Sequence, residues 1–220
     1  IRDALVGLVG SEMCIRDSPD ERIQVIHPIP ASLAEIRPLP HQSAHEILYV
    51  GQVIRGKGVD LLLQAMSRVT QPWHVTIVGT GNHLDHCRRL AAKHGIADRV
   101  EFTGWVPHRE LERYYARATF TVVPSRWPEP FGMVGIEAMA RGRAVVGFSA
   151  GGIPDWLRHG VNGLLAPAGD MEKLAEAIAS LLADPAYARS LGMRAAEIAA
   201  QQFTHNGYLE AMENLLEEVA

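Results

Sequence analysis

The chain has 220 residues, of which 47% are hydrophobic and 21% are charged, the balance of a folded globular protein rather than a disordered one. Its formal net charge of -4 excludes a broad basic surface for nucleic acid or anionic membrane, and no apolar run approaches the length of a transmembrane helix. The two cysteines, Cys14 and Cys87, are too few for a disulfide framework and fit a reducing, cytoplasmic compartment.

The first part of the chain differs from the rest. Residues 1–18 show neither helical nor strand periodicity, and the run VGSEMCIRDS within them resembles translated adapter sequence. We therefore leave this segment, with Cys14, out of the predicted fold; a genuine frayed terminus is the alternative. Residues 19–46 contain five prolines, which predicts an extended linker.

From residue 47 to 183, short apolar runs alternate with helical patterns. The runs are apolar on successive residues, as buried parallel strands are, and lie at 47–50, 75–78, 100–102, 120–123 and 144–148. Apolar residues with helical spacing follow between them, as in 59–69 and in 171–182, where Asp170 is a good N-cap. This succession predicts an α/β fold, a Rossmann-like doubly wound parallel sheet.

Residues 184–220 follow that pattern as two closing helices. Pro185 is expected to open the first of them, and Gly207 to lie near the break between the two.

The loops that follow the predicted strands are where a ligand should bind, because ligands of open parallel sheets lie beyond the carboxyl ends of the strands. The strongest pattern there is a pair of carboxylates, Glu129 and Glu137, which stand eight positions apart across a loop-to-helix junction. A helix is expected to begin near Gly132, so its first amides could bind an anion. Glu137 then lies in an apolar helix and needs a polar partner. A phosphorylated polyol would satisfy this layout; a solvated Glu129 and a Glu137 that caps or pairs with a neighbour are the alternative.

The segment 128–140 is similar to the E-x7-E signature of family 4 glycosyltransferases, the group 1 glycosyl transferases. The runs YVGQVIRGKGVDLLLQA, at 49–65, and GGIPDWLRHGVNGLL, at 151–165, resemble that family too, so the likeness covers about residues 47–183. It implies the donor-binding, C-terminal half of a retaining enzyme of the two-domain GT-B type. It also implies that the acceptor domain precedes residue 19, and that this part alone transfers no sugar.

The resemblance also implies roles for individual residues. Glu129 would hold the donor sugar, Glu137 the ribose, and Lys57 the diphosphate. The backbone of Val106 would contact the base, and the amides of Gly132, Met133 and Val134 would face the distal phosphate. The donor would be a UDP-, GDP- or ADP-sugar, and the acceptor an unidentified glycan, lipid or small molecule. The missing half could also bring peripheral association with a membrane.

One position departs from the family pattern. Gln52 stands where relatives commonly place an arginine that contacts the diphosphate, and glutamine brings no charge. Either Arg55 compensates for it or Arg55 is solvated, in which case Lys57 and the helix amides suffice. No Asp-x-Asp pair is present, so we expect no metal and no other cofactor, with Lys57 stabilising the leaving diphosphate and Glu129 acting beside it.

Other interpretations remain open at this stage. A non-catalytic nucleotide-sugar-binding homologue is favoured by Gln52 alone, and another GT-B enzyme, such as a nucleotide-sugar epimerase or a sucrose-type synthase, would share the same motifs. His83, His86 and Cys87 share a helix face and could bind a metal, although surface histidines are commoner. The tryptophans that flank the site loops, Trp105 and Trp127, are expected to pack into the core.

Overall fold

The computed structural model describes residues 26, 28–30, 36–42 and 45–219. The predictions for residues 1–18, and for most of the linker at 19–46, lie outside the described residues. None of the described helices combines the length and the apolar character that crossing a membrane requires.

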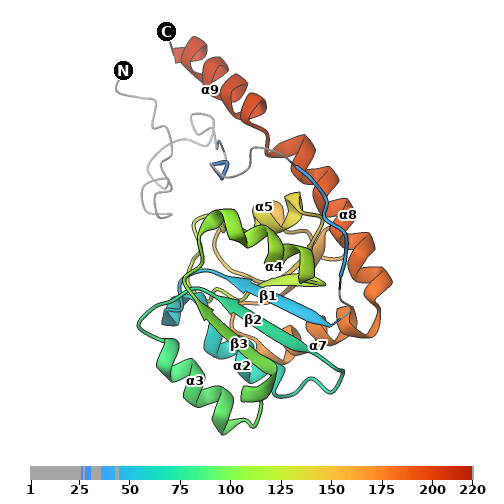
Figure 1. Ribbon diagram of the computed structural model, residues 1–220. Helices are drawn as coiled ribbons and strands as arrows, with labels where there is room; N and C mark the ends of the chain where they lie inside the picture. Colours follow the sequence, from blue (N-terminus) through green and yellow to red (C-terminus); the bar gives the residue numbers. More distant parts are fainter. Residues whose placement is uncertain (1–25, 27, 31–35, 43–44, 220) are drawn as a thin grey trace.

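A six-stranded parallel sheet with the order β3-β2-β1-β4-β5-β6 forms the centre of the molecule (Figure 1). The strands are β1 (Glu46–Val50), β2 (His74–Val78), β3 (Val100–Gly104), β4 (Phe120–Val123), β5 (Ala144–Ser149) and β6 (Gly163–Pro167). This order is the doubly wound arrangement, so the predicted fold class is confirmed. The first five strands agree with the predicted runs, whereas β6 was missed because its sequence, GLLAP, begins with glycine and ends with proline.

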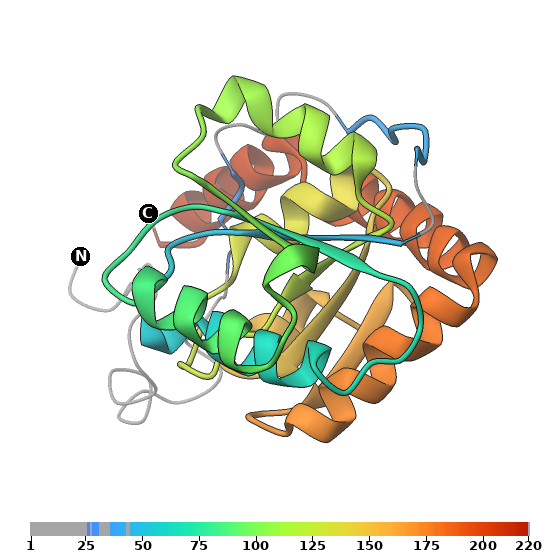
Figure 2. The same cartoon turned by 60° about the horizontal axis from the view of Figure 1, so that its bottom comes forward.

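Helices cover both faces of the sheet. They are α2 (Val59–Met66), α3 (Leu84–Lys93), α4 (Leu111–Arg117), α5 (Met133–Ala140), α6 (Ile153–Trp156), α7 (Met171–Ala183) and α8 (Pro185–Gln202). Helix α9 (His205–Val219) follows α8 and extends away from the sheet (Figure 1). One hydrophobic core joins the sheet to α2, α3 and α7, and a second joins it to α4, α5, α6 and α8. The two sets of helices lie on opposite faces of the sheet (Figure 2). Successive β1 residues alternate between the two cores, which is why the strands are apolar on both sides.

The C-terminal helices agree with the sequence in part. Asp170 caps α7, since its Oδ1 accepts hydrogen bonds from the amides of Glu172 and Lys173. Helix α8 opens at Pro185, as predicted. The break before α9 lies at residues 203–204 rather than near Gly207, because Thr204 Oγ1 accepts from the Gly207 amide at 3.1 Å and places that glycine in the first turn of α9.

The described end of the linker packs against this domain. Arg143 at the start of β5 is fully buried, and its guanidinium donates to the carbonyls of Leu39 and Pro40 at 2.9 and 2.8 Å and to that of Tyr115. Burial lowers the pKa of Arg143 to about 10. These hydrogen bonds therefore hold residues 39–40 against the end of α4 and the start of β5.

Candidate functional site

The strand order reverses between β1 and β4, which lie side by side in the middle of the sheet. A doubly wound sheet opens a crevice for ligands at such a switch point. The loop after β1 leads into a short 3-10 turn, η2 (Arg55–Lys57), and the loop after β4 runs over residues 124–132 to α5. Lys57 and Glu129 therefore come from the two loops that border the crevice.

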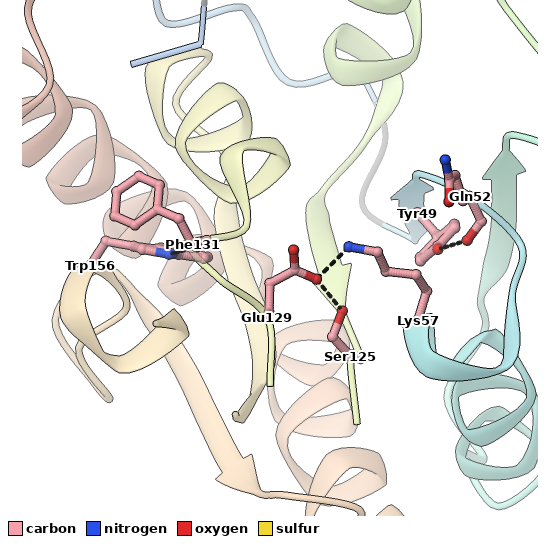
Figure 3. A network of polar contacts seen from close by, with 7 residues as sticks. All are labelled: Tyr49, Gln52, Lys57, Ser125, Glu129, Phe131 and Trp156. Carbon is pink, nitrogen blue, oxygen red and sulfur yellow. Dashed lines mark hydrogen bonds and ion pairs between the residues drawn. The ribbon is translucent and has the colours of Figure 1, made fainter. Parts of the chain in front are cut away.

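These two side chains form an ion pair, with Lys57 Nζ donating to Glu129 Oε2 (Figure 3). Ser125 Oγ donates to the same oxygen at 3.0 Å, and the other oxygen is directed away from both donors. Glu129 is only 7% exposed. The alternative that Glu129 is a solvated loop acid is therefore wrong: it is a buried carboxylate held by a cation and a hydroxyl.

Helix α5 begins at Met133, as the sequence indicated, and its N-cap is Gly132 in the left-handed region, with φ 80°. No side chain caps this helix end, so the first-turn amides have no side-chain acceptor of their own. Such a terminus, with the positive end of the helix dipole, is suited to an anion.

Trp156 of α6 packs against this helix end, and the sequence did not predict this contact. Its indole Nε1 donates to the Phe131 carbonyl, one residue before the N-cap (Figure 3). A Cβ added at Gly135 would lie 2.0 Å from the Trp156 ring, so the backbone of α5 rests directly on the indole. The signal was present in the run IPDW, at 153–156, but nothing in the sequence shows which element that tryptophan packs against.

Glu137 is partly buried in α5, and Tyr115 of α4 donates to its Oε2 at 3.3 Å. The sequence required a polar partner for this carboxylate, and the tyrosine hydroxyl is one. Burial and the neighbouring Glu137 carboxylate hold the pKa of Tyr115 well above its usual value, so its hydroxyl stays a donor.

A hollow of about 680 Å³ lies on the other side of β1, beyond the ends of β1, β2 and β3. Its lining is mostly apolar or uncharged and includes Val50, Gln52, Asn82, Trp105, Val106 and Leu111. Tyr49 donates to the Gln52 carbonyl at 2.7 Å, which fixes the loop while the Gln52 side chain is exposed (Figure 3). The hollow therefore has room for a flat, weakly polar group.

The predicted core packing of the two loop tryptophans is wrong. Trp105 is 73% and Trp127 63% exposed. Both lie in loops beyond the strand ends, where no described element covers them.

The other candidate residues are placed as follows. Arg55 is exposed at the start of the turn that ends in Lys57.

The set of possible metal ligands differs from the one that the sequence suggested, because Cys87 is fully buried and burial raises its pKa to about 12. Asp60 takes its place beside His83 and His86, with ligand atoms within 4.8 Å of one another. Arg126 Nη2, however, donates to both Asp60 oxygens, so this carboxylate already has a cation.

Comparison with known proteins places these features in a family. The family model "Glycosyl transferases group 1" matches residues 35–198. The D-inositol 3-phosphate glycosyltransferase 1 of Catenulispora acidiphila is 34% identical over 237 residues, covering 97% of this chain. The chain spans 53% of that relative's length, so it corresponds to about half of it.

Solved structures agree with the fold. Sucrose-phosphate synthase from Thermosynechococcus elongatus is 32% identical and superimposes with a TM-score of 0.77 over 89% of this chain and 52% of its own. HepE from Anabaena, solved in complex with UDP-glucose, is 25% identical with a TM-score of 0.71, over 79% of this chain and 48% of its own.

Proposed function

The chain belongs to the glycosyl transferases group 1 family, and from that premise we propose that it is the donor-binding half of a retaining, family 4 glycosyltransferase. The observation that carries the proposal is the meeting of Lys57, Glu129 and the uncapped start of α5 at the switch point of the sheet. A cation, a buried acceptor and a set of backbone donors are together what a sugar diphosphate requires.

Each part of the donor has a place in this proposal. Lys57 and the amides of residues 132–134 bind the diphosphate, and Glu129 accepts from the sugar hydroxyls. Glu137 accepts from the ribose hydroxyls, and the base enters the hollow beside Val106. Support for a nucleotide-sugar comes from HepE, which was solved with UDP-glucose.

The same residues account for the chemistry that we propose. Breaking the bond between the sugar and the phosphate places negative charge on the diphosphate and positive character on the sugar ring. Lys57 and the helix amides stabilise the first, and the Glu129 carboxylate, close to the ring, stabilises the second. No metal is needed in this scheme, because the cation is part of the chain.

A cytoplasmic location also belongs to the proposal; it rests on the low cysteine content, with Cys87 free and buried.

The experiment is a calorimetric titration of the whole chain with UDP, GDP and ADP, and with the corresponding glucose or mannose derivatives. We expect one base to be preferred, and its nucleotide-sugar to bind more tightly than the free diphosphate because Glu129 gains a partner. If no nucleoside diphosphate or nucleotide-sugar stabilises or binds the chain, the proposal is wrong.

Gln52 favours a second candidate, a homologue that binds the donor but transfers nothing. Both candidates predict donor binding, so binding alone does not separate them. An assay of the chain joined to its acceptor half separates the two candidates. Release of diphosphate from the donor, in the presence of acceptor or of water, identifies the enzyme.

A further inference from the structure

Asp60 and Arg126 form a partly buried ion pair that the proposed function does not use. Arg126 lies in the loop after β4, three residues before Glu129, and Asp60 lies in the first turn of α2, three residues after Lys57. Arg126 Nη2 donates to both oxygens of Asp60, whose side chain is 10% exposed. The pair therefore links the element that carries Lys57 to the loop that carries Glu129.

The backbones of the two loops are also in contact on both sides of Lys57. On one side, the Gly56 carbonyl accepts from the amides of Arg126 and Trp127 at 3.0 and 3.1 Å. On the other, Gly58 adopts φ +72°, and a Cβ there would lie 1.9 Å from the Pro124 carbonyl oxygen. Lys57 is thus flanked by two glycines that touch the Glu129 loop directly.

The environment of the pair makes each partner depend on the other. Arg126 Nε is buried and has no hydrogen-bond partner among the described residues. The Asp60 carboxylate is therefore the group that balances the charge of this guanidinium. Removing one partner would leave the other charge uncompensated in a partly buried position, which is unfavourable. The loops should then separate until water reaches the remaining charge.

A third loop reaches the same pair. His83, after β2, has its Nε2 3.8 Å from Asp60 Oδ2, and its amide donates to the Val53 carbonyl at 3.0 Å. The group that resembles a metal site therefore lies where the start of α2 and the loops after β2 and β4 meet, and Arg126 pairs with its carboxylate.

We propose that Asp60 and Arg126 are positioning residues, a clamp that fixes Lys57 relative to Glu129 so that both can bind one donor. This inference rests on the proposed function, since the reason to fix the two side chains is the ligand they share. Neither clamp residue touches the donor; both act through Lys57 and Glu129. A shift of about 1 Å in such groups is enough to lose much of their effect.

The test compares Arg126→Gln and Asp60→Asn with Arg68→Gln, which breaks an exposed ion pair with Glu172 between α2 and α7, away from the crevice. Donor affinity is measured by calorimetry for the nucleoside diphosphate and for the nucleotide-sugar that the wild-type chain prefers. We expect each clamp variant to weaken the nucleotide-sugar about tenfold, and by more than it weakens the diphosphate, because the nucleotide-sugar adds the contact with Glu129 to those with Lys57 and the α5 amides. Arg68→Gln should leave both affinities unchanged.

A purely structural role would give a different result. It would lower the midpoint of urea unfolding and leave the ratio of the two affinities of the folded chain as in the wild type. Adding Arg126→Gln to Lys57→Ala separates the two roles further, since a residue that acts through Lys57 should cause little further loss of diphosphate affinity when Lys57 is absent. Unchanged affinity ratios, or fully additive losses, overturn the clamp.

Amide hydrogen exchange supplies a readout that needs no ligand. In Asp60→Asn the amides of Arg126 and Trp127 should exchange faster, because they donate across the clamped contact. If the wild-type chain binds no nucleotide-sugar but these amides still exchange faster in Asp60→Asn, the proposed function is wrong. The ion pair then still holds the two loops together, as the clamp requires. If exchange is as slow as in the wild type, the clamp itself is wrong.

Discussion

The carboxyl edge of the sheet carries two unlike regions, one on each side of β1. The region between β1 and β4 holds its charges in two ion pairs, Lys57 with Glu129 and Asp60 with Arg126. The start of α5 in the same region is held by the Trp156 indole. The region beyond β2 and β3 is a hollow without an ion pair among its described lining residues, and it exposes Trp105. Fixed charges suit a ligand whose charge changes during reaction, whereas a flat group that only binds needs little more than a surface.

The largest expected effect tests how firmly the fixed region is built. Gly135→Ala places a Cβ against the buried Trp156 ring, at 2.0 Å without rearrangement. We expect a loss of about 3 kcal/mol in the free energy of unfolding, at the upper end for overpacking. Urea denaturation measures it. Trp105→Ala in the open region should change that value by no more than about 0.5 kcal/mol. Similar losses for both variants would remove the distinction between the regions.

Within the fixed region, the two glutamates should separate by ligand. Glu137→Ala should weaken nucleoside diphosphate and nucleotide-sugar alike, by about 1.5–3 kcal/mol, because both contain the ribose. Glu129→Gln should weaken mainly the nucleotide-sugar; the diphosphate keeps its affinity or gains some, since Lys57 loses a competing anion.

Calorimetry with both ligands on both variants is the measurement. Glutamine is used at position 129 because it keeps the size of the side chain next to Ser125. An equal loss of both ligands in Glu129→Gln contradicts its assignment to the sugar.

A smaller effect is expected for Arg55, at the boundary of the two regions. Its side chain is exposed, whereas that of Lys57 is 32% exposed and paired. Arg55→Ala should therefore cost less than about 1 kcal/mol of diphosphate binding, as exposed charges do, and clearly less than Lys57→Ala. Should the two losses be equal and non-additive, Arg55 compensates for Gln52 by swinging into the crevice.

No effect at all is expected from removing divalent metal ions. The proposed cation of the site is Lys57, and the Asp60 carboxylate, which lies beside His83 and His86, is engaged by Arg126. Diphosphate affinity measured in EDTA should equal that measured with Mg²⁺. A strong dependence on Mg²⁺ would mean that the fixed region lacks the charge that we ascribe to it.

The sequence by itself determined the order and type of the elements, because apolar runs and helical spacing are local patterns that burial imposes on any sheet covered on both faces. It also indicated the start of α5 near Gly132, the loops that carry Lys57 and Glu129, and the helix that carries Glu137. The boundary near Gly207 was wrong, because the Thr204 hydroxyl caps α9 three residues earlier. Strand β6 was missed, because the glycine and proline at the ends of GLLAP are typical of a loop.

Only the tertiary structure decided which side chains meet. Lys57 and Glu129 are 72 residues apart in the chain, and Asp60 and Arg126 are 66 apart, so no local pattern connects them. The same holds for Trp156 under α5, for Tyr115 beside Glu137, and for the exposure of Trp105 and Trp127. Such contacts arise because parallel strands bring their carboxyl ends to one edge, and which loops then touch depends on the strand order of the folded sheet.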